Sequence, residues 1–289
     1  MKSINGHTKT LGLIGYPVGH TLSPVIHNYL AEKYGQELVY VPLPVEPGKL
    51  EDALKGAAAF GFPGMNVTVP YKNDVIPLCM EVDELAAKIG SVNTLVWNGM
   101  GYKGYNTDVT GLYRAMTEDG VAIEGENVVI LGAGGVSRTV AYLMADKKAK
   151  HVYLMNRTFE KAAQLAEHVN KDFRQELITP LAYEDHKMLP EGDYLAIQAT
   201  SLGMSPRTEG VAIEDAEFYR KIKCGYEIIF NPAKTRFMKL VEEAGGVAYN
   251  GLKMLLYQGI DAYELWNPVK ISREDIEALY EIMKETLGL

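Results

Sequence analysis

A glycine-rich turn is the feature of the sequence that most directly suggests chemistry. The apolar run 127–131 leads straight into residues 132–136, which read Gly-Ala-Gly-Gly-Val, and a helical pattern follows. Such a turn directs free backbone N–H groups and the positive end of a helix dipole at one point, where they attract phosphate. A Cβ in the turn would hold a pyrophosphate away from the backbone. The pattern predicts a dinucleotide-binding loop at 132–136, with a purely structural turn as the alternative.

The residues after the next expected strand indicate which dinucleotide binds. The apolar segment 151–155 ends in Asn156, Arg157 and Thr158, and Lys161 follows one helical turn later. An NAD-binding unit usually carries a carboxylate here, and a carboxylate would repel the 2′-phosphate of NADP. Arg157 can pair with that phosphate instead, whereas cations disfavour a helix N-terminus that binds no anion. The sequence therefore predicts NADP as the cofactor.

Short apolar segments alternate with helix-period segments along the chain, which is typical of βαβ units and parallel sheets. In the first half, strands are expected at 11–14, 38–45 and 64–69, with helices at 23–34 and 49–59. In the second half, strands are expected at 127–131, 151–155, 194–199 and 225–230, with helices at 109–118, 159–169, 252–265 and 273–286. Ser23 is the expected N-cap of the first helix, because Pro24 follows it. The pattern predicts an α/β protein whose last two helices return to the first domain.

The composition narrows the classes of function. A net charge of -8 is not that of a nucleic-acid-binding protein. No segment has the apolar length that crosses a bilayer, and the N-terminus is too polar for a signal peptide, so a cytoplasmic protein is expected. Cys79 and Cys224 form no CxxC pair and the 6 histidines show no close spacing, so we expect neither a disulfide framework nor a metal site. A length of 289 residues suits two domains.

Six blocks of the sequence, in order, resemble the signature segments of the shikimate dehydrogenase family. They are residues 15–24 (GYPVGHTLSP), 66–72 (NVTVPYK), 90–94 (GSVNT), 104–108 (GYNTD), 198–204 (QATSLGM) and 251–258 (GLKMLLYQ). The resemblance spans nearly the whole chain. It implies a mostly parallel α/β substrate domain made of residues 1–108 with 251–289. It also implies a Rossmann-type NADP-binding domain at 109–250, with the cleft between the two domains.

The resemblance also implies a reaction, the reduction of 3-dehydroshikimate to shikimate with NADPH in chorismate and aromatic amino-acid biosynthesis. The implied catalytic pair is Lys72 and Asp108. Ketone reduction must deliver a proton to the developing alkoxide, and a lysine beside a carboxylate can do this while its charge stabilises the oxygen. Taken alone, Lys72 also fits an ordinary surface lysine. The expected partners are small molecules, not nucleic acid or membrane, and the expected assembly is a monomer or homodimer.

Further residues receive binding roles by the same resemblance. Short polar side chains are assigned to the carboxylate and hydroxyls of a small acid, which they suit by size and hydrogen-bonding capacity: Thr21, Ser23, Asn66, Thr68, Asn93, Asp108 and Gln258. The pyrophosphate is assigned to Gly132, Ala133, Gly134, Gly135 and Val136, and the adenosine phosphate to Asn156, Arg157, Thr158 and Lys161. The nicotinamide end is assigned to Ile228 and Gly251.

Three residues depart from the family pattern. Thr21 replaces a serine, Gln198 replaces an asparagine, and Phe230 stands where the family usually has a tyrosine that touches the substrate. Thr21 and Phe230 leave open a quinate or quinate/shikimate dehydrogenase that uses NAD or NADP. A non-catalytic paralogue that senses a metabolite or NADP is a further alternative, which the presence of both Lys72 and Asp108 disfavours.

Overall fold

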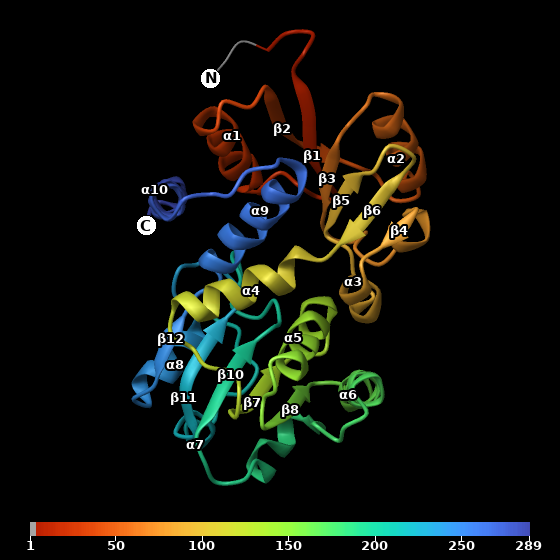
Figure 1. Cartoon of the computed structure of the whole chain (residues 1–289). Coiled ribbons are helices and arrows are strands. Elements are labelled where there is room, and N and C mark those ends of the chain that lie inside the picture. The colour runs from red at the N-terminus through yellow and green to blue at the C-terminus, as the bar shows by residue number, and fades with distance from the viewer. Residues whose placement is uncertain (1–3) are drawn as a thin grey trace. The chain divides into compact units, whose positions relative to one another are not determined.

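The chain forms two compact units in the computed structural model, which describes residues 4–289 (Figure 1). Unit 1 consists of Met1–Gly111 with Leu256–Leu289, and unit 2 consists of Leu112–Leu255. The chain passes from unit 1 to unit 2 inside helix α4 (Thr107–Glu118) and returns inside helix α9 (Leu252–Trp266). Each unit contains one six-stranded sheet.

The sheet of unit 1 has the order β2-β1-β3-β5-β6-β4. Its strands are β1 (Lys9–Gly15), β2 (Leu38–Pro44), β3 (Gly64–Val67), β4 (Glu81–Val82), β5 (Thr94–Trp97) and β6 (Tyr102–Tyr105). The β1/β2, β1/β3 and β4/β6 pairs are parallel, whereas β5 runs antiparallel to β3 and β6. The sequence did not predict the β5–β6 hairpin, because both strands are short and flank a glycine-rich turn. The Asn98 side chain closes that turn by accepting from the N–H groups of Met100 and Gly101.

Helices α1 (Ser23–Lys33), α2 (Leu50–Ala59), α3 (Glu84–Ile89) and α10 (Arg273–Leu287) complete unit 1, with a short 3-10 turn at Ile76–Leu78. The N-cap predicted at Ser23 is wrong by one residue. The cap is Leu22, and the Ser23 hydroxyl accepts a hydrogen bond from Thr21 instead. The C-terminal helix α10 packs on α1, where Tyr34 Oη donates to Asp275 Oδ2 at 2.8 Å. The last helix thus belongs to unit 1.

The two faces of the sheet in unit 1 bury different sets of side chains. Met65 and Val67 on β3 point into one apolar core, and Leu11 and Leu13 on β1 point into another. Because side chains alternate along a strand, Asn66 lies on the second face, next to Leu13 in the strand register. A buried amide needs hydrogen-bonding partners, since leaving it unpaired costs free energy. The fold therefore places a polar group in a position that demands a polar network around it.

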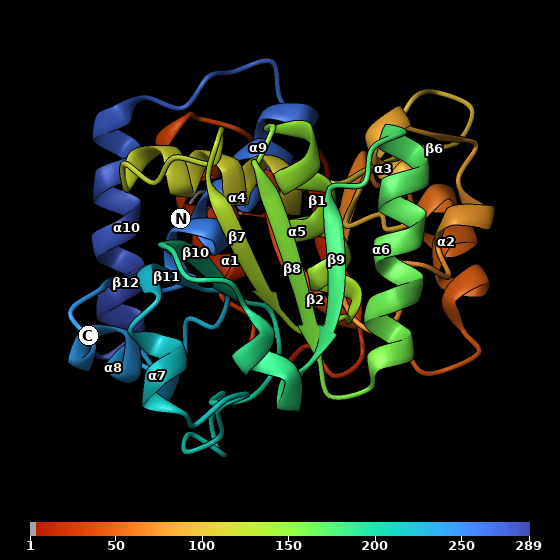
Figure 2. The ribbon, with the colours of Figure 1, turned by 90° about the horizontal axis from the view of Figure 1, so that it is seen from below.

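The sheet of unit 2 is entirely parallel, with the order β12-β11-β10-β7-β8-β9 (Figure 2). Its strands are β7 (Asn127–Leu131), β8 (His151–Asn156), β9 (Ile178–Ala182), β10 (Tyr194–Gln198), β11 (Ile222–Glu227) and β12 (Val247–Tyr249). Its helices are α5 (Gly135–Asp146), α6 (Phe159–Phe173), α7 (Ala216–Tyr219) and α8 (Arg236–Glu243), with a 3-10 turn at Tyr183–Met188. Residues 228–230 lie beyond β11, so the strand predicted at 225–230 ends three residues too late. The apolar run continues past the strand end, and apolar pattern alone does not mark that end.

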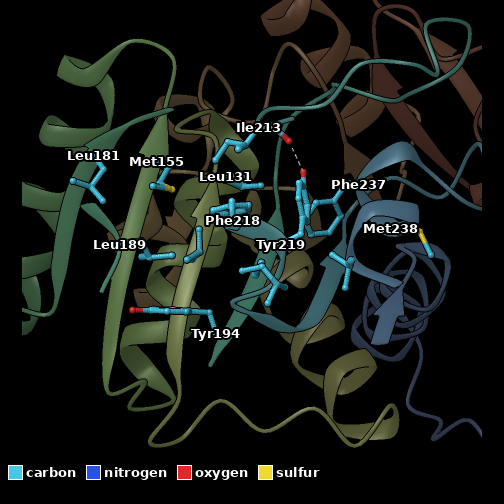
Figure 3. Packing of buried hydrophobic residues seen from close by; sticks show 14 residues of the cluster. Leu131, Met155, Leu181, Leu189, Tyr194, Ile213, Phe218, Tyr219, Phe237 and Met238 are labelled. Atoms are coloured by element: carbon cyan, nitrogen blue, oxygen red, sulfur yellow. Dashed lines mark hydrogen bonds between the residues drawn. The ribbon is translucent and has the colours of Figure 1, made fainter. Parts of the chain in front are cut away.

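Alternating residues of the central strands form one core of unit 2 (Figure 3). Val129 and Leu131 of β7 contribute to it, together with Phe218 of α7 and Phe237 of α8. The buried Tyr219 donates its hydroxyl to the Ile213 carbonyl at 2.7 Å, so its polar end is satisfied. This packing fixes the ends of β7, β8 and β11, which most of the predicted cofactor residues follow.

Candidate active site

Lys72 and Asp108 form the central ion pair of unit 1. Lys72 follows β3, Asp108 lies in the first turn of α4, and Nζ of Lys72 is 2.7 Å from Oδ2 of Asp108. The side chains are 22% and 12% exposed, so the pair is partly shielded from water but still reachable. Such shielding strengthens the electrostatic interaction between the two charges. The two residues predicted as the catalytic pair are therefore in direct contact.

Asn93 holds the other oxygen of Asp108. Its Nδ2 donates to Asp108 Oδ1 at 2.9 Å, while its Oδ1 accepts from the backbone N–H of Thr107 at 2.7 Å. The start of α4 is fixed further by Asn106, whose Oδ1 accepts from the N–H of Val109 at 3.2 Å. Asn93 is thus bound on both sides of its amide, and it orients the carboxylate that contacts Lys72.

Asn66 belongs to the same buried network through residues that the sequence did not single out. Its Nδ2 donates to Thr94 Oγ1 at 3.0 Å and to the Asn93 carbonyl at 3.2 Å. Its Oδ1 accepts from the hydroxyl of Tyr40 at 2.7 Å. Both amide protons of Asn66 are therefore used inside the protein. The available signal for Tyr40 was a tyrosine on an expected strand, which by itself is also an ordinary core residue.

The other polar residues assigned to the substrate also belong to unit 1, whereas Phe230, assigned to the substrate as well, lies in unit 2. Thr21 and Ser23 are 3.1 Å apart at their hydroxyl oxygens. The Thr68 backbone N–H donates to the Ile14 carbonyl at 2.9 Å, just beyond β3. Gln258 lies on α9 and is 9% exposed, where its backbone packs against Gly111 of α4. A Cβ at Gly111 would lie 2.5 Å from the Gln258 backbone nitrogen, so glycine permits the two helices to approach there.

The glycine turn lies between β7 and α5 in unit 2. Gly132 has a φ of 112°, which favours glycine, and an added Cβ would lie 2.7 Å from the Thr200 methyl carbon. By contrast, a Cβ at Gly134 or Gly135 would meet no described atom within 4 Å. Packing explains why residue 132 is glycine but does not explain Gly134 and Gly135. A phosphate lying against the backbone would explain these two. The first N–H groups of α5 lack acceptors inside the helix, so the turn fits a pyrophosphate.

The residues predicted to select the cofactor follow β8. Asn156 Nδ2 donates to the Thr158 carbonyl at 2.8 Å and holds the turn, while Arg157, Thr158 and Lys161 are exposed. Thr158 is the N-cap of α6, yet its side chain makes no capping hydrogen bond. Burial raises the pKa of Tyr183 to about 12, and the nearby positive charge of Arg157 opposes that rise. A guanidinium, a hydroxyl and a helix N-terminus thus gather at one point, as a phosphate group requires.

Ile228 and Gly251, the residues assigned to the nicotinamide end, contact each other in unit 2. A Cβ at Gly251 would lie 2.0 Å from the carbonyl oxygen of Ile228, so only glycine fits. Glu227, which the sequence did not single out, stabilises the segment that contains Ile228 through two hydrogen bonds. Its carboxyl group accepts from the Ile229 N–H at 3.0 Å and from the Thr235 hydroxyl at 2.8 Å. Burial raises the pKa of Glu227 to about 8.

We expect Glu227 to make the stability of the protein depend on pH. Between its ordinary pKa of 4.5 and the raised value of about 8, the folded state holds a proton that the unfolded state has lost. Stability contributed by Glu227 therefore falls as pH rises through this range. Glu227→Gln keeps the side-chain shape without titrating, so its Tm should vary less with pH. Calorimetric scans of both proteins from pH 5 to pH 9 test this, and parallel curves would contradict it.

Two departures from the family pattern are also visible in unit 2. Gln198 is fully buried at the end of β10, where Nε2 donates to the Leu202 carbonyl at 3.0 Å. It also accepts from Thr200, so it organises the turn after β10. Phe230 is half-buried beyond β11. Nothing in its surroundings within unit 2 requires a phenylalanine in place of a tyrosine.

Other kinds of site receive no support from residues 4–289. These residues contain no group of three or more His, Cys, Asp or Glu side chains placed to hold a metal. None of their helices combines the length and apolar character that spanning a bilayer requires. Cys79 and Cys224 are free, and burial raises the pKa of each thiol to about 11. Both thiols are accordingly protonated and weakly nucleophilic at neutral pH.

The fold and the site define a two-domain α/β oxidoreductase that uses a dinucleotide. Residues 13–95 match the shikimate dehydrogenase substrate binding domain, and residues 115–201 match the shikimate/quinate 5-dehydrogenase domain. The NADP(+)-dependent shikimate dehydrogenase of Halothermothrix orenii is 38% identical over 91% of this chain and 92% of its own length. The chain belongs to the shikimate dehydrogenase family.

Solved structures agree with this assignment. The shikimate 5-dehydrogenase of Thermus thermophilus, in complex with NADP(H) and shikimate, has a TM-score of 0.83 at 28% identity, covering 95% of this chain and 99% of its own. The quinate dehydrogenase of Corynebacterium glutamicum, in complex with NAD, has a TM-score of 0.86 at 28% identity, covering 96% of this chain and 99% of its own. The fold is therefore shared by relatives that differ in substrate and cofactor.

Proposed function

We propose that the protein catalyses the NADP-dependent, reversible reduction of 3-dehydroshikimate to shikimate. The observation that carries the proposal is the ion pair of Lys72 and Asp108, which are 2.7 Å apart in the unit that contains the matched substrate-binding segment. The relative from Halothermothrix orenii, 38% identical, is named for this activity with NADP(+). Arg157 at the end of β8 supports NADP over NAD, because no carboxylate stands at that turn.

The proposal also assigns a task to each unit and a setting to the enzyme. Residues 1–108 with 251–289 bind the substrate, and residues 109–250 bind NADP. The enzyme acts in the cytoplasm on small molecules, as a monomer or homodimer, in the pathway to chorismate and the aromatic amino acids. The hydroxyl and amide side chains gathered in unit 1 support the first assignment, and the glycine turn with Arg157 supports the second.

The chemistry follows from the polarity of the site. NADPH, when bound, supplies the hydride that reaches the carbonyl carbon of the substrate. Lys72 donates a proton to the carbonyl oxygen, and its positive charge stabilises the negative charge that develops there. Asp108 holds the ammonium group in place and also accepts a hydrogen bond from a substrate hydroxyl. In the direction of shikimate oxidation, Lys72 takes the hydroxyl proton back.

Initial rates with shikimate and quinate, each with NADP and NAD, test this function. We expect the shikimate and NADP pair to give the highest kcat/KM of the four. No turnover with any pair would contradict an enzymatic role and favour a sensor. A preference for quinate or for NAD would move the protein to the second candidate function, a quinate/shikimate dehydrogenase.

Phe230 is the residue that favours considering this second function. If the family tyrosine donates a hydrogen bond to shikimate, its absence costs about 0.5 to 1.5 kcal/mol of binding. Phe230→Tyr should then lower KM for shikimate several-fold and leave kcat nearly unchanged, the signature of uniform binding. Selective loss of quinate turnover in the same variant would indicate that Phe230 makes room for the additional hydroxyl. Unchanged kinetics with both substrates would show that residue 230 does not contact the substrate.

A further inference from the structure

We infer that Tyr40 is a positioning residue for the Lys72–Asp108 pair and acts through a buried chain of hydrogen bonds inside unit 1. Tyr40 lies on β2, outside all six sequence blocks that resemble the family, and is 1% exposed. The inference rests on the proposed function, because that function gives the pair its catalytic role.

The first link joins Tyr40 to Asn66. The backbone carbonyl of Asn93 can only accept a hydrogen bond, so the atom of Asn66 that lies 3.2 Å from it must be Nδ2. This fixes the orientation of the Asn66 amide and leaves its Oδ1 facing the Tyr40 hydroxyl at 2.7 Å. The phenol is therefore the donor, and it holds Asn66 so that Nδ2 also donates to Thr94 Oγ1 at 3.0 Å.

The second link passes through two threonine hydroxyls. Thr94 Oγ1 and Thr107 Oγ1 are 3.0 Å apart, and each lies 3.1 Å from Asn93 Oδ1. Each hydroxyl has one proton to donate. Thr94 gives its proton either directly to Asn93 or to Thr107, and in the second case Thr107 gives its own to Asn93. Both arrangements carry the chain from Asn66 to the same amide oxygen.

The last link reaches the carboxylate. Asn93 Oδ1 accepts from the Thr107 backbone N–H at 2.7 Å, which fixes this amide as well and leaves Nδ2 to donate to Asp108 Oδ1 at 2.9 Å. Every link therefore runs in the same direction, from the Tyr40 hydroxyl to Asp108. Hydrogen bonds aligned in this way polarise and strengthen one another in a low-dielectric interior.

Burial makes the chain sensitive to its first member. Asn66, Asn93, Thr94 and Thr107 are all at most 4% exposed, so water cannot replace a lost partner easily. Without the Tyr40 hydroxyl, Asn66 Oδ1 loses the hydrogen bond of 2.7 Å. The amide is then held only through Nδ2, by the Asn93 carbonyl and Thr94, and its hydrogen bond to Thr94 is weakened. The carboxylate of Asp108 would then be held less firmly against Lys72.

Tyr40→Phe isolates the hydroxyl, because the ring has separate contacts. The ring stacks on His27 with 4.2 Å between centroids and lies 6.2 Å from the ring of Trp266. Burial lowers the pKa of His27 to about 3. The imidazole that stacks on Tyr40 is therefore neutral near pH 7 and adds no charge to the surroundings of the tyrosine ring. These contacts remain in the phenylalanine variant.

The test is a double-mutant cycle in kcat for shikimate oxidation with NADP+. Tyr40→Phe should lower kcat about three- to tenfold, the value of one hydrogen bond. In an Asp108→Asn background the same change should alter kcat less than about twofold, because the last member of the hydrogen-bond chain has already been replaced. The matched control is Tyr102→Phe, which removes another buried hydroxyl of unit 1, donated to the Phe62 carbonyl at 3.0 Å. It should leave kcat within about twofold of wild type.

Three outcomes would overturn the inference: equal losses in both backgrounds, an equal loss in the control, or an unchanged kcat for Tyr40→Phe. Urea unfolding of the wild type, the two single variants and the double variant gives their free energies of unfolding, which need no substrate to measure. A connected chain predicts unfolding free energies that are not additive, and additive values would also overturn it. If the wild-type protein oxidised no shikimate, the proposed function would fail, while the unfolding cycle would still decide whether the chain exists.

Discussion

Lys72→Ala is expected to remove most of kcat while changing KM for shikimate only a few-fold. The ammonium group acts mainly on charge that develops in the transition state, so its loss affects the chemical step more than binding. A general acid or base contributes about a hundred- to ten-thousand-fold. Steady-state rates with NADP+ and shikimate measure the effect.

Lys103→Ala is the matched control for this variant. Lys103 also lies in unit 1 and pairs with a carboxylate, at 3.4 Å from Glu81, and its side chain is 34% exposed. Its loss should leave kcat within about twofold, since exposed ion pairs contribute little. If Lys72→Ala kept more than about a tenth of the wild-type kcat, Lys72 would not be the proton donor. Asp108→Asn should be comparably damaging and should also raise KM, because this carboxylate is assigned to a substrate hydroxyl.

The strand and helix order was largely predictable because local pattern determines it. The strand at 127–131 and the helices opening at Phe159 and Leu252 follow from apolar periodicity and flanking glycines, and the structure confirms them. The hairpin of β5 and β6 was not predicted, since each strand has only 4 residues and pairs with a neighbour that local pattern does not reveal. The end of β11 was misplaced for a related reason, because the buried Glu227 side chain takes over the N–H of Ile229.

Some residues of the candidate site were predictable from local pattern, whereas others depend on contacts that only the tertiary fold creates. Gly132 is required by its own backbone angle, and Gly251 by a contact with Ile228 that no local pattern encodes. Lys72 and Asp108 are 36 residues apart, and only the tertiary fold brings them together. Tyr40 and Glu227 escaped notice because their role depends on partners reached through the fold. A single sequence shows them as an ordinary core tyrosine and an ordinary glutamate.

Arg157→Ala is expected to weaken NADP binding and leave NAD binding nearly unchanged. The guanidinium at the end of β8 can form paired, charge-assisted hydrogen bonds with a 2′-phosphate, a group that NAD lacks. The loss of such a contact is worth roughly 1.5 to 3 kcal/mol, or about ten- to a hundredfold in affinity. Fluorescence or calorimetric titration with each cofactor gives the two affinities directly, without substrate.

The ratio of the two affinities is the decisive quantity, because it separates phosphate recognition from support of the fold. Arg174→Ala is the matched control, since Arg174 is an exposed arginine at the opposite end of α6 and should affect neither cofactor. Arg157 also lies near Tyr183, so a structural role would disturb the end of β8 and weaken both cofactors together. An equal loss for NADP and NAD would therefore show that Arg157 supports the fold. A loss confined to NADP identifies Arg157 as the residue that binds the 2′-phosphate. The salt dependence of NADP binding should then diminish in the variant, because one charge-assisted contact has been removed.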